Sequence, residues 1–162
     1  EYTWGCVMLL EQGQKIAVAI IEKLAPYCER IEVAGSIRRK KEFVRDIDLV
    51  LIPKDPWNLT HEIGSLGRMP VKGSKIQRVN YQGAQVDIYM ATRETWATLF
   101  LIRTGSTENN IRLCAAAQKK GWKLHANGDG LFDENGRRIA GDTEESIYAA
   151  LGEPYQQPKE RG

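Results

Sequence analysis

Two aspartates at the start of a short apolar stretch constrain this chain more than any other feature. Over residues 46–52, apolar side chains alternate with Asp46 and Asp48, and Pro53 closes the stretch. Because successive side chains of a strand point to opposite faces, this alternation predicts a strand whose two aspartates share one face. Their α-carbons would lie about 6.5 to 7 Å apart, so both carboxylates can converge on one ion.

A second strand candidate, residues 85–91, places Asp87 in the same alternating pattern. If the two strands pair, three carboxylates meet. At about 4 Å each pair would repel by roughly 4 kcal/mol at an effective dielectric of 20, so a cation has to compensate. Oxygen ligands without a nearby His or Cys favour Mg²⁺ or Mn²⁺ over Zn²⁺, and two such ions are a standard arrangement for phosphoryl transfer. The alternative is a set of solvated strand ends.

Gly35 and Ser36 follow a short strand candidate, residues 31–34, and predict the start of a helix with Arg38 and Arg39. A helix N-terminus presents free backbone N–H groups to an anion, glycine lets a phosphate approach closely, and serine and arginine add hydrogen bonds. This segment would therefore bring a triphosphate to the metals. The alternative is a plain helix cap followed by a solvated basic turn.

The remaining pattern predicts an α+β fold, in which a small mixed sheet is backed by helices and followed by a helix-plus-hairpin part. Apolar residues at helical spacing predict a helix over residues 11–24, which Pro26 ends. Gln82 and Gly83 predict a turn between strands at 75–80 and 85–91. Further helices are expected at 57–66, before Gly105, from Ile111 to near Gly121, and at 144–151, with turns at 127–130 and 135–136.

The composition, with 42% hydrophobic and 27% charged residues, is that of a globular protein and argues against disorder. A shift in composition near Gly105 predicts a sheet-rich part over residues 1–104 and a smaller part over residues 105–162. The apolar runs are too short to span a bilayer, so we expect an intracellular protein, in the cytoplasm or nucleoid. Without a CxxC pair, the three cysteines favour neither a disulfide framework nor a zinc site; they are Cys6, Cys28 and Cys114.

Basic residues gather in three clusters, at residues 38–45, 68–78 and 119–123, although the net charge is only +2. Such clusters mark either a face that binds a phosphate-rich partner or ordinary solvated surface. Charge alone does not decide between the two.

The motifs taken together resemble the nucleotidyltransferase superfamily in the form used by the family X DNA polymerases, in particular their prokaryotic members. The glycine-serine segment and the paired aspartates carry the signature, and further matches extend the resemblance over nearly the whole chain. The matching stretches are residues 33–39, 46–48, 72–73, 85–87, 104–106, 109–112 and 154–161.

This resemblance implies a role for each carboxylate. Asp46 and Asp48 would bind two Mg²⁺ ions, for which Mn²⁺ can substitute. Asp87 would bind the catalytic ion and activate the primer 3′-hydroxyl for in-line attack on the α-phosphate of a dNTP, with pyrophosphate leaving. The residues 1–104 would form the palm, and residues 105–162 the thumb.

The resemblance also implies the contacts of the incoming nucleotide and the DNA. The triphosphate would bind to Gly35, Ser36 and Arg39. The nucleotide sugar would lie against Gly105 and Ser106, in a turn that often contains a cis peptide. The nascent base pair and the template would face Asn110 and Arg112 of the thumb.

Several positions depart from the family pattern. Ile102 and Arg103 replace the aromatic pair that usually precedes the Thr-Gly-Ser turn, and Gln85 replaces an arginine that many members have two positions before the third aspartate. The loop at residues 107–108 is shorter than in the animal enzymes. The chain also has no counterpart of the helix-hairpin-helix, fingers or phosphoesterase regions, so it resembles a minimal core.

The sequence therefore predicts a DNA-directed DNA polymerase of family X type, a monomer that fills gaps or extends primer–template DNA in DNA repair. One alternative is a template-independent or small-substrate nucleotidyltransferase, with NTP in place of dNTP as a further open choice. The other alternative is a catalytically silent nucleic-acid-binding module. The presence of all three aspartates together with Ser36 and Arg39 argues against a silent module.

Overall fold

A five-stranded mixed sheet forms the centre of the computed structural model, which describes residues 7–162. The second and third strands in spatial order run parallel to each other, whereas all other neighbouring strands are antiparallel. This arrangement confirms the predicted α+β fold with a small mixed sheet. In spatial order the strands are β2 (Cys28–Val33), β4 (Ile47–Pro53), β7 (Ala84–Met90), β6 (Ile76–Tyr81) and β5 (Val71–Lys72).

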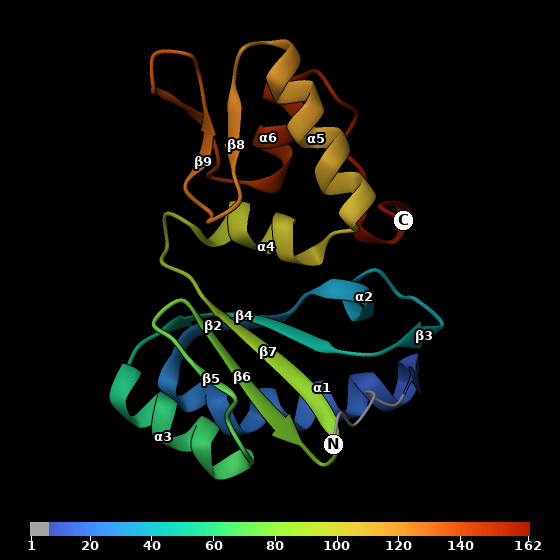
Figure 1. Ribbon diagram of the computed structural model, residues 1–162, viewed down its shortest axis with the longest axis vertical. Coiled ribbons are helices and arrows are strands. Elements are labelled where there is room, and N and C mark those ends of the chain that lie inside the picture. The colour runs from blue at the N-terminus through green and yellow to red at the C-terminus, as the bar shows by residue number, and fades with distance from the viewer. Residues whose placement is uncertain (1–6) are drawn as a thin grey trace.

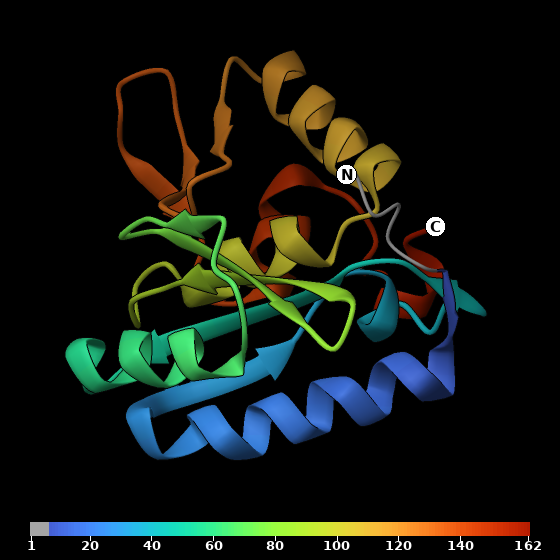
Figure 2. The same cartoon turned by 60° about the horizontal axis from the view of Figure 1, so that its bottom comes forward.

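Two helices cover one face of this sheet (Figures 1 and 2). Helix α1 (Leu10–Leu24) ends where a 3₁₀ turn, η1 (Ala25–Tyr27), begins with Pro26 near its start. Helix α3 (Pro56–Leu66) begins with proline in its first turn, and the side chain of Asp55 caps it by accepting a hydrogen bond from the Asn58 N–H. Both helices lie close to their predicted positions.

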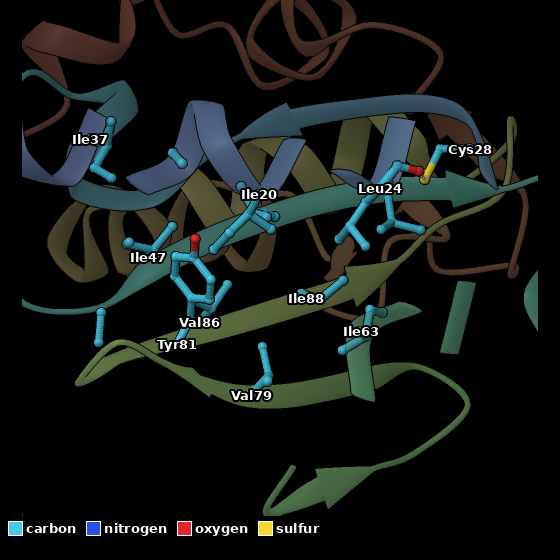
Figure 3. Packing of buried hydrophobic residues seen from close by; sticks show 14 of the residues in the cluster. Ile20, Leu24, Cys28, Ile37, Ile47, Ile63, Val79, Tyr81, Val86 and Ile88 are labelled. Atoms are coloured by element: carbon cyan, nitrogen blue, oxygen red, sulfur yellow. Dashed lines mark hydrogen bonds between the residues drawn. The ribbon is translucent and has the colours of Figure 1, made fainter. Parts of the chain in front are cut away.

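The main core lies between these helices and the sheet (Figure 3). Ile20 and Leu24 of α1 and Ile63 of α3 are fully buried against Val86 and Ile88 of β7. Each such side chain contributes roughly 1.5 to 3 kcal/mol by leaving water. This packing makes β4 and β7 a rigid base for polar residues on their other face.

The segment between β2 and β4 is short and irregular. Helix α2 (Gly35–Arg38) comprises only four residues, one turn, and the strands β1 (Met8–Leu9) and β3 (Phe43–Val44) pair antiparallel beside it. The predicted helix start at Gly35 is confirmed. However, a single turn has few aligned peptide dipoles, so its N–H groups rather than a long helix dipole would attract an anion.

The C-terminal part lies above the sheet in the view of Figure 1 and has its own hydrophobic core. Helix α4 (Trp96–Thr104) lies between the two parts: Trp96 and Phe100 pack toward the sheet, and Leu101 packs into the C-terminal core. The predicted helix-plus-hairpin arrangement is confirmed. Its elements are α5 (Thr107–Lys119), β8 (Lys123–His125), β9 (Gly130–Phe132), β10 (Arg138–Ala140), α6 (Glu144–Leu151) and the 3₁₀ turn η2 (Pro158–Glu160).

Some boundaries differ from the predictions by a few residues. Strand β2 begins at Cys28, three residues before the predicted start, because it pairs with β4 as far as Pro53. Cys28 and Cys114 are free thiols, and Cys6 lies outside the described residues. Over residues 7–162, no helix combines the length and apolar character needed to cross a bilayer.

Candidate active site

Asp48 and Asp87 stand next to each other on the two parallel central strands. Their α-carbons are paired in the register of β4 and β7, and neighbouring strands lie about 4.8 Å apart. Asp46 immediately precedes β4, two positions before Asp48, so alternation puts it on the same face. The pairing of the two strands thus brings the three predicted carboxylates to one end of the sheet.

The Asp87 carboxylate, however, is turned toward its own hairpin. Arg78 of β6 donates from Nε to Oδ1 at 2.7 Å and from Nη2 to Oδ2 at 3.4 Å, and Gln85 Nε2 lies 3.3 Å from Oδ2. Among the described residues, no three His, Cys, Asp or Glu side chains stand together as a ready metal cluster. The carboxylate oxygens of the three aspartates are ligands that suit a hard cation, and their strands bring them to the same end of the sheet. To bind the same ion as Asp48, the Asp87 side chain has to turn away from Arg78.

The crowding of these carboxylates perturbs their ionisation. Burial, followed by the negative charges of Asp87 and Asp46, raises the pKa of Asp48 to about 7. Burial and the Asp87 carboxylate also raise the pKa of Asp46, although Arg78 and Arg45 partly oppose the shift. Repulsion between like charges is the strain that a bound cation would relieve.

This raised pKa predicts that the metal-free protein loses stability as the pH rises from about 4 to about 7. The folded pKa of Asp48, about 7, lies above the ordinary aspartate pKa of 3.8, so the native state binds more protons between these two values. The stability contributed by Asp48 is complete below 3.8, declines as the pH rises and has been lost once the pH is above about 7. Thermal unfolding in EDTA measures this profile. Asp48→Asn should flatten it, and an equally steep decline in that variant would contradict the assignment.

Gly35 lies directly against the Asp48 carboxylate. Its φ is +60°, and a Cβ at this position would overlap Oδ2 of Asp48. The neighbouring Ala34 N–H donates to the Asp48 carbonyl at 2.8 Å. The junction between β2 and α2 is therefore fixed against the strand that carries the aspartates, with no space for a side chain.

We expect Gly35→Ala to lower the free energy of unfolding by about 2–3 kcal/mol, because it combines an unfavourable positive φ with an overlap. Gly136→Ala is the matched control. Gly136 also has a positive φ, of +78°, but a Cβ added there would meet no heavy atom within 4 Å, so only the backbone cost of roughly 1 kcal/mol should appear. Urea unfolding measures both; equal losses would show that the contact with Asp48 has no effect.

Ser36 belongs to the single turn of α2, and Arg39 is its C-cap. Ser36 is half-buried and lies inside the helix, whose N-cap is Ala34 without a side-chain hydrogen bond. The plain-cap alternative for Ser36 is therefore wrong. Arg39 donates from Nη1 to the Thr104 carbonyl at 2.6 Å, so it reaches from α2 to the end of α4.

The Thr-Gly-Ser turn connects α4 to α5 beside Arg39. Gly105 has a φ of +71°, and the peptide between Gly105 and Ser106 is cis, as the family pattern predicts. Ser106 is buried, caps α5 by accepting from the Asn109 N–H at 3.2 Å, and donates its hydroxyl to the Arg161 carbonyl. The N–H groups of this turn are also bonded within the protein, from Gly105 to the Leu101 and Ile102 carbonyls and from Ser106 to the Arg161 carbonyl.

The two residues expected to face DNA are held by intramolecular bonds. Asn110 donates to the Ile102 carbonyl at 2.9 Å, and its Oδ1 is buried without a partner. Arg112 donates to Glu153 at 2.6 Å and to Gln156 at 2.8 Å. Asn110 of α5 is thus tied to α4, and Arg112 of α5 is tied to the C-terminal segment.

A cavity of about 560 Å³ opens beside Arg39. Its basic lining residues are Arg39, Lys41, Arg112 and Arg161, and the turn at Ser106 borders it. The cavity thus joins the predicted triphosphate residue Arg39 to the predicted DNA residue Arg112, and Glu108 and Glu160 line it as well.

Several residues of the site are not evident from the sequence. In the sequence, Arg78 is part of the basic cluster at residues 68–78, and this clustering does not indicate its ion pair with Asp87. Arg103 lies near the end of α4, and its guanidinium carbon lies 4.2 Å from the centre of the Tyr89 ring. Glu144 joins Arg38 to a C-terminal arginine over more than a hundred residues of sequence, for which no local pattern exists.

Known proteins that are similar to this chain include DNA polymerases. The family model described as "DNA polymerase beta thumb" matches residues 99–162. A DNA polymerase/3′-5′ exonuclease PolX of Bacillus subtilis is 28% identical over 91% of this chain, which spans 27% of the length of that relative. A repair DNA polymerase X of African swine fever virus, isolate Pig/Kenya/KEN-50/1950, is 26% identical over 96% of this chain and 99% of the viral protein.

Solved structures agree with these sequence relatives. Leishmania infantum polymerase beta in a ternary P/T complex superimposes with a TM-score of 0.85 and 20% identity, over 99% of this chain and 78% of that one. The same polymerase in a ternary gap complex gives a TM-score of 0.85 at 19% identity. The likeness extends over both the sheet and the C-terminal part, so the two parts together make up one known fold.

Proposed function

Because this chain belongs to the family X DNA polymerases, we propose that it adds deoxynucleotides to the 3′-hydroxyl of primer–template or gapped DNA in DNA repair. The observation that supports this most is the register of β4 and β7, which sets Asp48 beside Asp87 while Gly35 lies against Asp48. Nucleotidyl transfer needs a cluster of carboxylates next to a turn that can bind phosphate.

The proposal divides the chain into a palm, residues 1–104, and a thumb, residues 105–162. Helix α4 would connect the two, since its side chains enter both the sheet-side core and the C-terminal core. The first six residues of this palm lie outside the described residues. We propose that the protein acts as a monomer inside the cell.

Asp46, Asp48 and Asp87 would hold two Mg²⁺ ions, or Mn²⁺ in their place. When bound, the ions would supply Lewis-acid stabilisation of the charge on the reacting phosphate. Asp87 would accept the proton of the attacking 3′-hydroxyl, while the new bond from O3′ to the α-phosphorus forms and the bond to pyrophosphate breaks. The raised pKa of Asp48 suits a carboxylate whose negative charge a bound cation would offset.

The other residues would bind and orient the nucleotide and the DNA. Ser36 and Arg39 would hold the β- and γ-phosphates, with the Gly35 N–H facing the same anion. The backbone of Gly105 and Ser106 would lie against the sugar. The thumb residues Asn110 and Arg112 would contact the nascent base pair and the template. To do so, they would have to release their present hydrogen bonds within the protein.

Primer extension on a one-nucleotide-gapped duplex tests the proposal. The purified chain is mixed with Mg²⁺ or Mn²⁺ and with each dNTP or NTP alone. Extension only by the complementary dNTP is the expected result. Addition of all four would instead indicate a template-independent transferase, and binding of DNA without any extension in either metal would indicate a silent module.

A further inference from the structure

The Asp87 carboxylate is the most tightly held charge in the site. It is 6% exposed, and both of its oxygens accept hydrogen bonds from the side chains of Arg78 and Gln85. The Arg78 side chain is 36% exposed, so it reaches in from the solvent side. A buried carboxylate is thus compensated by a partly solvated guanidinium.

The fold itself imposes this pairing. β6 and β7 form a hairpin around the two-residue turn at Gln82 and Gly83, and their register puts Arg78 directly opposite Asp87. Residues directly opposite on antiparallel strands share a face with Cβ atoms about 5 Å apart. A slip by one residue would turn Arg78 to the opposite face, so the contact is fixed by the turn.

Three charges consequently form a row across three neighbouring strands. Asp48 on β4 is in register with Asp87 on β7, and Asp87 is in register with Arg78 on β6. Two of the charges are negative, and the arginine lies on one side only. Asp87 can therefore face either the guanidinium or an ion placed between itself and Asp48, and in this structure it faces the guanidinium.

We propose that Arg78 is a positioning residue that holds Asp87 in the metal-free protein and competes with a divalent ion for this carboxylate. Arg78 thereby weakens the affinity of the site for the ion that Asp87 binds. The inference rests on the proposed function only in taking Asp46, Asp48 and Asp87 as the metal ligands. A merely structural salt bridge would stabilise the hairpin, and its loss would leave metal affinity unchanged or lower it.

Mn²⁺ binding to the DNA-free and nucleotide-free chain tests the competition. Free Mn²⁺ is measured by electron paramagnetic resonance at pH 8, above the pKa of Asp48 of about 7. Arg78→Met removes the guanidinium but keeps a chain of similar length. We expect it to bind Mn²⁺ roughly three- to tenfold more tightly than the wild type, the range that a partly exposed ion pair supports.

Arg45→Met is the matched control, because Arg45 also lies near the carboxylates but has no bond to Asp87. It removes the same charge and should change the affinity less than twofold. Arg78→Lys keeps the charge but loses the two-point contact, so an intermediate gain of about twofold to threefold is expected. Thermal unfolding shows whether Arg78→Met folds. If it does not, the Mn²⁺ affinity of Arg78→Lys tests the competition instead.

Several results would overturn the proposal. They are an unchanged or weaker Mn²⁺ affinity in Arg78→Met, an equal gain in Arg45→Met, wild-type affinity in Arg78→Lys, or no Mn²⁺ binding by any form at millimolar concentration. The primer-extension assay keeps this outcome separate from the proposed function. Tighter Mn²⁺ binding without extension would retain the inference and remove the polymerase proposal, and extension with unchanged Mn²⁺ binding would do the reverse.

Discussion

Asp87→Asn should lower single-turnover extension of a gapped primer by at least about a thousandfold, or about 4 kcal/mol in transition-state stabilisation. Asparagine keeps the size of the side chain and one acceptor oxygen but loses the charge. It can therefore neither offset a cation beside Asp48 nor take the proton of the 3′-hydroxyl. The rate of the first nucleotide addition, measured with enzyme in excess over DNA, gives the effect without interference from product release.

Asp142→Asn is the control for this substitution. Asp142 is also paired with an arginine, Arg138, at 2.8 Å, but its side chain is 87% exposed and belongs to the C-terminal part. The single-turnover extension rate of Asp142→Asn should stay within about twofold of the wild-type rate. A rate for Asp87→Asn within tenfold of the wild type, with a normal thermal transition, would remove Asp87 from the chemistry.

Local sequence patterns were enough to predict the strands that carry the three aspartates. The alternation around Asp46 and Asp48 depends only on the two-residue period of a strand. The hairpin from Ile76 to Met90 depends on a turn whose residues, Gln82 and Gly83, both have positive φ. Such features are encoded within a few neighbouring residues, and tertiary packing has little power to change them.

The Arg78–Asp87 pair is also encoded locally, although the clustering of basic residues does not reveal it. With a two-residue turn at Gln82 and Gly83, Tyr81 pairs with Ala84, and counting outward by three places Arg78 opposite Asp87. Gln85, two positions before Asp87 on the same strand, offers this carboxylate an amide without a charge. The neighbouring strand supplies a guanidinium instead.

The thumb residues and the length of α2 could not be predicted in the same way. Whether Arg112 is free or bound depends on where Glu153 and Gln156 lie, some forty residues later in the chain. Helix α2 ends at Arg38, and the strand β3 that follows it pairs with β1, some thirty-five residues earlier in the chain. Both involve contacts distant in sequence, to which no periodic pattern is sensitive.

The network around Glu144 is the clearest long-range case, and it predicts a large loss of stability. Glu144 accepts from Arg38 at 2.6 and 3.2 Å and from Arg161 at 2.6 Å. Glu144 is 9% exposed, and the Arg161 side chain is fully buried. Arg38 belongs to α2, Glu144 begins α6 and Arg161 lies in the C-terminal segment, so one carboxylate bonds to two arginines from the two sides of the interface.

Glu144→Gln should therefore lower the free energy of unfolding by about 3–5 kcal/mol, because it leaves a buried arginine without a counter-charge. Glu145→Gln is the control: Glu145 is the next residue of α6 and is exposed, so its loss should change stability by no more than about 0.5 kcal/mol. Urea unfolding of both variants gives the difference. A loss below about 1 kcal/mol for Glu144→Gln would mean that water or another group compensates Arg161. In that case the interface between the sheet and the C-terminal part would depend on the apolar packing of α4 instead.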